Sequence, residues 1–93
     1  MTTAGRRVLI VYNPTSGWRR VSRLQAVVRR LHELGCAVEI RPTRGPGDAT
    51  VLARAGVIER FDVIVAAGGD GTINEVANAI PANGPPLGVV PLG

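Results

Sequence analysis

The stretch from residue 62 to residue 79 constrains the fold more than any other part of this chain. It starts with the apolar run 62–66, continues through Gly-Gly-Asp-Gly (68–71), and changes to a helical pattern that ends at Ala79. A buried strand that turns directly into a helix is typical of a parallel α/β sheet. Backbone N–H groups converge at such a helix start, and the helix dipole adds partial positive charge there. The turn is therefore suited to bind an anion, and phosphate is the anion we expect.

The rest of the chain repeats this alternation of strand and helix. Apolar runs predict strands at 8–12, 36–40, 62–66 and 87–90, and helical periodicity predicts helices at 18–34, 49–60 and 72–79. Such alternation favours parallel strands joined by right-handed crossovers. Glu39 interrupts the second run, which indicates an edge strand, whereas the third run is apolar enough to be central. The predicted fold is one three-layer α/β domain over residues 1–93, with an open, mostly parallel sheet, helices on both faces and an incomplete C-terminus.

Local signals predict how the helices begin and end. Gly35 is expected to cap the C-terminus of the first helix, and Asp48 to cap the N-terminus of the second. Thr72 and Glu75 have the spacing of a capping box for the third helix. The three glycines of the 68–71 turn are expected to adopt positive φ and to let a ligand approach the backbone.

The core must be aliphatic, because hydrophobic residues make up 45% of the 93 residues and aromatic residues only 3%. Leu34, Val51 and Ile58 lie on the predicted apolar faces of the first two helices, and Cys36 is expected to fill a small gap. A single cysteine permits no intrachain disulfide, and no apolar run has the length of a signal sequence core or a membrane span. These features predict a cytoplasmic protein.

The chain is basic through arginine alone: all eleven basic residues are arginine, and seven acidic residues leave a net charge of +4. Genome composition explains the absence of lysine more simply than function does. Arg19, Arg23 and Arg30 form a flank of the first helix that we interpret as a solvated face, and no nucleic-acid partner is predicted. Peripheral contact with the inner face of a membrane and formation of a homodimer stay open.

Several common sites do not fit these residues. A P-loop ends in Gly-Lys-Ser/Thr, and the chain has no lysine. The pattern Gly69-x-Gly71-x-x-Asn74 follows the third strand and lacks the third glycine of the dinucleotide fingerprint. His32 has no constellation of ligating residues around it, so no metal site is predicted in this chain, and no Ser, His and acid set suggests hydrolysis.

Three loops are expected to meet at one edge of the sheet. Loops that leave the carboxyl ends of parallel strands lie on the same edge, where ligands bind. Residues 13–17, 42–47 and 68–71 follow the first three strands in this way. Asp70 lies within the third loop, where the turn alone allows it either to serve a ligand or cation or merely to tolerate the turn. Its place among converging loops favours a role in binding.

Together these loops resemble the catalytic domain of diacylglycerol kinases, as found in bacterial lipid kinases and sphingosine kinases. The resemblance rests on Asn-Pro-Thr-Ser-Gly (13–17), Thr43, Gly-Gly-Asp-Gly-Thr-Ile-Asn-Glu (68–75) and Leu-Gly-Val-Val-Pro-Leu-Gly (87–93). It implies the fold of the NAD kinase and diacylglycerol kinase N-terminal domains, which bind ATP with Mg²⁺. The residues that it implies for contact with ATP are Asn13, Pro14, Thr15, Ser16, Gly17, Thr43, Gly68, Gly69, Asp70, Gly71, Thr72, Ile73 and Asn74, with Asp70 close to the nucleotide.

The resemblance also implies a division of labour. Members of this family continue past Pro-Leu-Gly with a threonine and then a β-rich domain, which supplies the catalytic base, the magnesium site and much of the lipid pocket. This chain is therefore expected to be the ATP-binding half of a kinase for a lipid hydroxyl such as that of diacylglycerol. No catalytic residue and no activity are expected in this half alone. An NAD kinase-like enzyme and a non-catalytic nucleotide-binding or assembly fragment are the alternatives.

Overall fold

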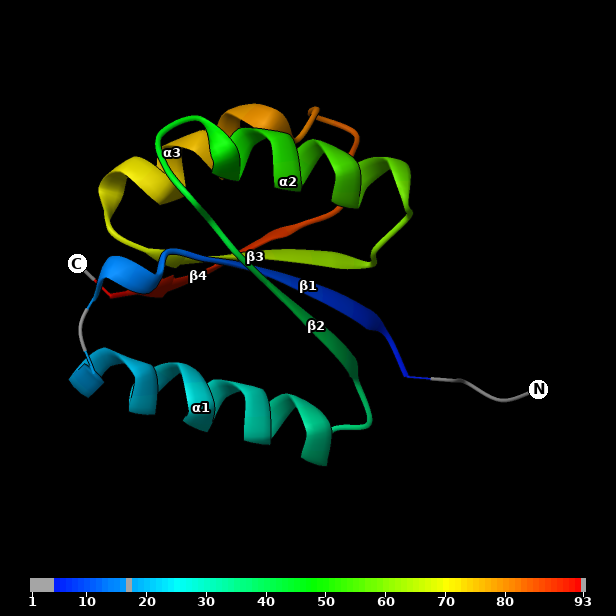
Figure 1. The fold of residues 1–93 in the computed structure, drawn as a ribbon. Helices are drawn as coiled ribbons and strands as arrows, with labels where there is room; N and C mark the ends of the chain where they lie inside the picture. Colours follow the sequence, from blue (N-terminus) through cyan, green and yellow to red (C-terminus); the bar gives the residue numbers. More distant parts are fainter. Residues whose placement is uncertain (1–4, 17, 93) are drawn as a thin grey trace.

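The computed structural model describes residues 5–16 and 18–92, which form three layers (Figure 1). The elements in chain order are β1 (Arg7–Tyr12), η1 (Pro14–Ser16), α1 (Trp18–Glu33), β2 (Ala37–Pro42), α2 (Asp48–Ile58), β3 (Val63–Gly68), α3 (Asp70–Ala79) and β4 (Leu87–Pro91). Helix α1 covers one face of the sheet, and α2 and α3 cover the other (Figure 1). The predicted α/β class and its layers are confirmed. No described helix has the length and apolar character that crossing a membrane would require.

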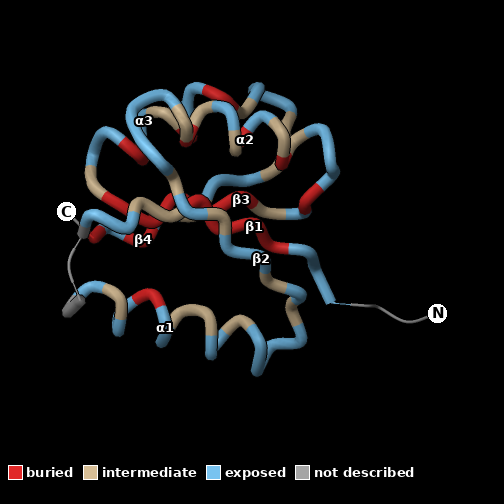
Figure 2. Tube along the Cα trace, viewed as in Figure 1, coloured by how far each residue is buried: buried red, intermediate tan, exposed pale blue. Residues whose placement is uncertain are grey.

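The four strands are parallel and lie in the order β2-β1-β3-β4. The two central strands, β1 and β3, are largely buried, while β2 is largely exposed, as the colours of Figure 2 show. Glu39 does lie on an edge strand, because β2 pairs only with β1. The central position predicted for the third strand is also confirmed.

The sheet separates two apolar layers. On the side of α2 and α3, the buried cluster consists of Leu9, Val11, Ala49, Ala53, Phe61, Ile64, Ala66, Val76 and Ala79. On the side of α1, it consists of Val8, Ile10, Leu24, Val65, Ala67, Val90 and Leu92, and Cys36 packs against it as expected. Alternate residues of each central strand point to opposite faces, which is why neighbouring residues belong to different clusters.

The predicted apolar faces of the helices are wrong at three positions. Leu34 and Val51 are each 61% exposed, and Ile58 is 80% exposed. Helix α2 instead buries small residues, and a Cβ at Gly56 would lie 2.5 Å from Leu9 Cδ2. At this close approach small residues occupy the positions nearest the sheet, Leu52 and Val57 pack beside them, and Val51 and Ile58 lie on the outer side of α2.

The helix ends agree with the prediction at one position and differ at two. Gly35 has φ 84°, its N–H donates to His32 C=O (2.9 Å), and Cys36 N–H donates to Leu31 C=O (3.0 Å), which is a Schellman motif. Asp48 is not the cap of α2, because Gly47 occupies that position and Asp48 is the first helical residue.

The capping box at the start of α3 is also wrong. The helix begins two residues earlier than predicted, at Asp70, with Gly69 as the N-cap and no side-chain capping bond. The first helical turn closes when Ile73 N–H donates to Gly69 C=O at 3.1 Å. Thr72 and Glu75 therefore lie inside the helix, and their side chains are available for other partners.

Candidate functional site

A cleft of about 440 Å³ lies at the carboxyl edge of the sheet, between the loops that follow β1, β2 and β3. We call it the loop cleft. It is lined by Asn13, Pro14, Thr15, Thr43, Arg44, Gly45, Pro46, Ala49, Gly71, Thr72 and Glu75. The three loops meet because their strands are parallel neighbours, so their carboxyl ends share one edge.

Asn13 joins the first loop to the third. Its backbone N–H donates to Ala67 C=O (2.9 Å), which continues the pairing of β1 with β3. Its side-chain Nδ2 donates to Thr72 Oγ1 (3.3 Å), while its Oδ1 accepts from the N–H (3.0 Å) and Oγ1 (2.8 Å) of Thr15. The amide thus orients the residues of η1 against the first turn of α3.

The second loop forms the facing wall of the cleft. Thr43 N–H donates to Tyr12 C=O (2.7 Å), and Arg44 N–H donates to Asp48 Oδ2 (2.9 Å). At the far end of the loop, Gly47 N–H donates to Glu75 Oε2 (3.1 Å). Arg44 gives this wall a positive charge that suits an anionic ligand.

The glycines of the third loop act differently from the prediction. Among the described glycines, positive φ occurs at Gly35 and Gly47, so the expectation for the 68–71 turn is wrong. Gly68 is instead required by close packing, because a Cβ there would lie 2.7 Å from Thr72 Oγ1. Gly71 faces open space, with nothing within 4 Å of its Cβ position. A ligand can still approach the backbone at Gly71, because this residue has no side chain and not because its φ is positive.

The structure brings six of the predicted residues into the lining of the cleft: Asn13, Pro14, Thr15, Thr43, Gly71 and Thr72. Five others do not line it: Gly68, Gly69, Asp70, Ile73 and Asn74. Asp70 is exposed in the first turn of α3 beside Gly71, whereas Ile73 packs against the core. Gly17 and the side chain of Ser16 lie outside the described residues.

Sequence reasoning missed five lining residues, namely Arg44, Gly45, Pro46, Ala49 and Glu75. The cluster of proline and glycine after the second strand did place this loop at the ligand edge, but only Thr43 was singled out within it. The spacing of Thr72 and Glu75 predicts a capping box, and this local explanation of Glu75 gives no sign of its position in the cleft.

A cluster of charges anchors the edge strand that leads into the second loop. Arg41 donates to both carboxylate oxygens of Glu59, from Nη1 at 3.0 Å and from Nη2 at 2.7 Å, and also pairs with Glu39. This hydrogen bonding lowers the pKa of the Glu59 carboxyl below its usual range. The guanidinium groups of Arg7 and Arg41 lie 4.2 and 5.4 Å from the ring centroid of Phe61. These contacts join β2 to the C-terminal end of α2.

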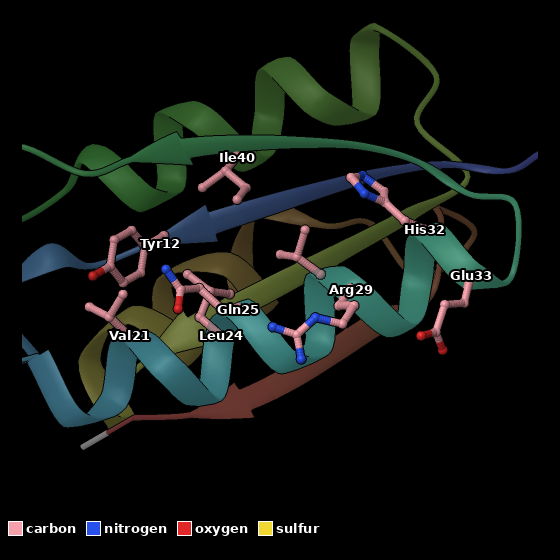
Figure 3. Close-up of a pocket in the computed structure, with 9 residues that line it drawn as sticks. Tyr12, Val21, Leu24, Gln25, Arg29, His32, Glu33 and Ile40 are labelled. Carbon is pink, nitrogen blue, oxygen red and sulfur yellow. The ribbon is translucent and has the colours of Figure 1, made fainter.

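A second hollow, of about 710 Å³, lies between α1 and strands β1 and β2 (Figure 3). We call it the α1 groove. It is lined by Tyr12, Val21, Leu24, Gln25, Val28, Arg29, His32, Glu33 and Ile40. Its floor is apolar, and its lining includes none of the residues predicted to contact ATP that the structure describes.

Comparison with known proteins places the chain in a family. The family model described as "Diacylglycerol kinase catalytic domain" matches residues 7–93. The diacylglycerol kinase of Bacillus subtilis (strain 168) is 43% identical over 91 residues, covering 95% of this chain and 30% of the relative. The corresponding protein of Staphylococcus aureus (strain bovine RF122 / ET3-1) is 44% identical over 91 residues, with 95% and 29% coverage.

A solved structure shares the fold and shows the same difference in length. The crystal structure of a diacylglycerol kinase from Bacillus anthracis str. Sterne superposes with a TM-score of 0.74 at 26% identity, covering 100% of this chain and 33% of that chain. The chain therefore spans about a third of the length of the relatives it matches. It belongs to the diacylglycerol kinase catalytic domain family.

Proposed function

We propose that these 93 residues form the ATP-binding part of a lipid kinase, which in a longer protein transfers the γ-phosphate of ATP to a lipid hydroxyl such as that of diacylglycerol. The observation that carries the proposal is the loop cleft, where the first turn of α3 opens at Gly71 between two polar loops. Membership of the diacylglycerol kinase family supports the choice of reaction.

The chemistry of the cleft suits a chain of phosphates. Phosphoryl transfer depends mainly on holding the donor in place and neutralising its charge. The start of α3 presents backbone N–H groups and the positive end of the helix dipole, and Gly71 places no side chain in front of them. Thr15 and Thr43 add hydroxyl groups, and Arg44 adds a positive charge on the facing wall.

Mg²⁺ would accompany the phosphates of ATP and neutralise part of their charge. In the described part of the chain, no group of three or more His, Cys, Asp or Glu residues could hold a metal ion. Mg²⁺ that is bound mostly by phosphate and water needs only one or two protein carboxylates. Asp70, exposed beside Gly71, fits that smaller role.

The role of Asp70 is tested by replacing it in a full-length enzyme that carries this domain. We expect Asp70→Ala to lower turnover by at least about a thousandfold while thermal unfolding stays unchanged, because the side chain is exposed. Glu33→Ala, which removes an exposed charge far from the cleft, is the matched control. Near-normal turnover of Asp70→Ala would refute the role given to this residue.

Binding by this chain alone separates the proposal from its alternatives. Calorimetric titration should show ATP binding by the 93 residues, without phosphorylation of diacylglycerol. No binding at millimolar ATP would favour a non-catalytic assembly fragment. In the full-length enzyme, phosphorylation of NAD instead of lipid would favour an NAD kinase-like activity.

A further inference from the structure

The carboxylate of Glu75 links two helices at the loop cleft. Glu75 is half-buried on α3, and its Oε2 accepts a hydrogen bond from Gly47 N–H at 3.1 Å. In the opposite direction, Thr50 Oγ1 on α2 donates to the backbone C=O of Glu75 at 3.3 Å. The start of α2 and the middle of α3 are thus joined by a pair of hydrogen bonds on the wall of the cleft.

Gly47 is a special position at this junction. Its φ of 86° is a conformation that favours glycine, and it is the N-cap residue of α2. The carboxylate therefore lies at the positive end of the α2 dipole and accepts a charge-assisted hydrogen bond, which is stronger than a neutral one. Glu75 on the neighbouring helix α3 thus accepts from the Gly47 N–H. Asp48, the next residue, instead accepts from the Arg44 N–H.

This bond fixes the far end of the second loop. The near end is fixed by a hydrogen bond that Thr43 N–H donates to Tyr12 C=O at 2.7 Å. Between these two points, residues 44–46 form the wall that faces Gly71 and Thr72 across the cleft. The bond between Gly47 and Glu75 is therefore one of the contacts that hold the two walls at their separation, together with the bond between Thr50 and Glu75.

The bond between Gly47 and Glu75 also makes the two helix starts at the cleft different from each other. Ala49 at the start of α2 and Gly71 at the start of α3 both line it. The Glu75 carboxylate already accepts a hydrogen bond at the start of α2, while the start of α3 carries the exposed Asp70 and has open space beside Gly71. The open backbone at Gly71 is the position where a phosphate can approach a helix start.

We propose that Glu75 is a positioning residue of the loop cleft: it holds Gly47, and through it residues 44–46, at the distance from α3 that nucleotide binding requires. The inference rests on the proposed function, because the ligand it serves is ATP. Glu75 acts through the second loop and makes its contribution before the nucleotide arrives.

The test compares Glu75→Ala and Glu75→Gln with Glu33→Ala in the 93-residue chain. Two quantities are measured: the hydrogen exchange rate of the Gly47 amide without nucleotide, and the affinity for ATP by calorimetry. We expect Glu75→Ala to accelerate Gly47 exchange and weaken ATP binding, each by about tenfold, as loss of one charge-assisted hydrogen bond implies. Glu75→Gln keeps an acceptor of the same shape without the charge and should recover about half of the loss in both quantities.

The control removes the same charge without touching the cleft. Glu33 pairs with Arg30 on the exposed side of α1, so Glu33→Ala should change neither quantity. Unchanged Gly47 exchange in Glu75→Ala, combined with weaker ATP binding, would overturn the proposal and indicate direct contact with the nucleotide. The proposal would also be overturned if Glu75→Gln preserved the exchange rate of the Gly47 amide but lost as much ATP affinity as Glu75→Ala.

The design separates this inference from the proposed function. If the unsubstituted chain binds no ATP, the proposed function fails for this chain, whereas the exchange rates still show whether Glu75 holds the second loop. If Glu75→Ala does not fold, Glu75→Gln supplies the decisive comparison because it preserves side-chain volume.

Discussion

The loop cleft and the α1 groove are both hollows beside β1, but they are built in different ways. The groove is larger, about 710 Å³ against about 440 Å³, and its floor consists of apolar side chains (Figure 3). The cleft is lined by glycines, hydroxyl groups and charged residues from three loops. Size alone would make the groove the candidate binding site, whereas the polar lining favours the cleft as the site for a nucleotide.

The difference lies in how each hollow is held open. The cleft is bounded by hydrogen bonds between distant segments, such as Asn13 with Thr72 and Gly47 with Glu75. On the groove side, α1 buries Leu24 but Val27, Val28 and Leu31 only in part, and Ile40 on the edge strand stays 41% exposed. The hydrogen-bonding groups of the cleft converge from three loops and suit a polar ligand, whereas the groove combines an apolar floor with polar side chains such as Gln25 and Arg29 from α1.

The largest effect is expected where the cleft depends on close packing. Gly68→Ala places a Cβ 2.7 Å from Oγ1 of the buried Thr72. We expect the free energy of unfolding to fall by about 2 to 3 kcal/mol, because the β-branched neighbour has little freedom to move. Thermal or urea unfolding measures this change. Gly45→Ala, where a Cβ meets nothing within 4 Å, is the matched control, and equal stability of the two variants would contradict the packing argument.

The same substitution at Gly71 should separate binding from stability. Gly71→Ala meets nothing within 4 Å and lies inside α3, so the free energy of unfolding should stay constant or rise by up to about 1 kcal/mol. Its methyl group projects into the cleft, so we expect ATP affinity to fall by about tenfold, which corresponds to about 1.4 kcal/mol. Calorimetry measures the affinity. Unchanged affinity would mean that the phosphates do not approach α3.

An intermediate effect is expected at the ion pair between Arg41 on β2 and Glu59 at the C-terminal end of α2. The pKa of Glu59 is lowered in the fold, so the pairing stabilises the protein above the ordinary glutamate pKa of about 4.3. This contribution is lost as the pH falls through the lower folded pKa. Arg41→Gln should therefore lose less stability than the unsubstituted chain between pH 7 and pH 3.

Thermal unfolding at the two pH values measures this difference. Arg30→Gln removes a more exposed ion pair with Glu33. The loss of stability between pH 7 and pH 3 in this variant should be nearly the same as in the unsubstituted chain. At pH 7, Arg41→Gln also loses the contact with Phe61, which contributes roughly 0.5 to 1 kcal/mol. An Arg41→Gln variant that is as acid-sensitive as the unsubstituted chain would contradict this account.

The smallest effect is expected in the α1 groove. Ile40→Thr keeps the branched side chain of an edge strand and should change the free energy of unfolding by less than about 1 kcal/mol. ATP affinity should not change, because Ile40 lines the groove and not the cleft. A large loss of ATP affinity in this variant would show that the groove, rather than the cleft, receives the nucleotide.

Much of the fold follows from local patterns in the sequence. The alternation of apolar runs and helical periods predicts all four strands, and Glu39 correctly predicts an edge position for β2. The outward positions of Val51 and Ile58 do not follow, because they depend on the close contact between Gly56 and Leu9. Periodicity identifies an apolar face but not how near the sheet will approach it.

The site was predictable in its location and less so in its contacts. Parallel topology brings the loops together, and it places Asn13, Thr43 and Thr72 in one cleft. The hydrogen bond from Gly47 to Glu75 joins residues that are 28 positions apart in sequence. It depends on how α2 and α3 lie against each other, which no local spacing specifies.

The most direct test of the central claim is to titrate the 93-residue chain with ATP and follow each backbone amide by NMR. We expect saturable shifts at Thr43, Gly71 and Thr72, which line the loop cleft, and none at Val28 or Ile40 in the α1 groove. No saturable shift at millimolar ATP, or shifts confined to the groove, would contradict it.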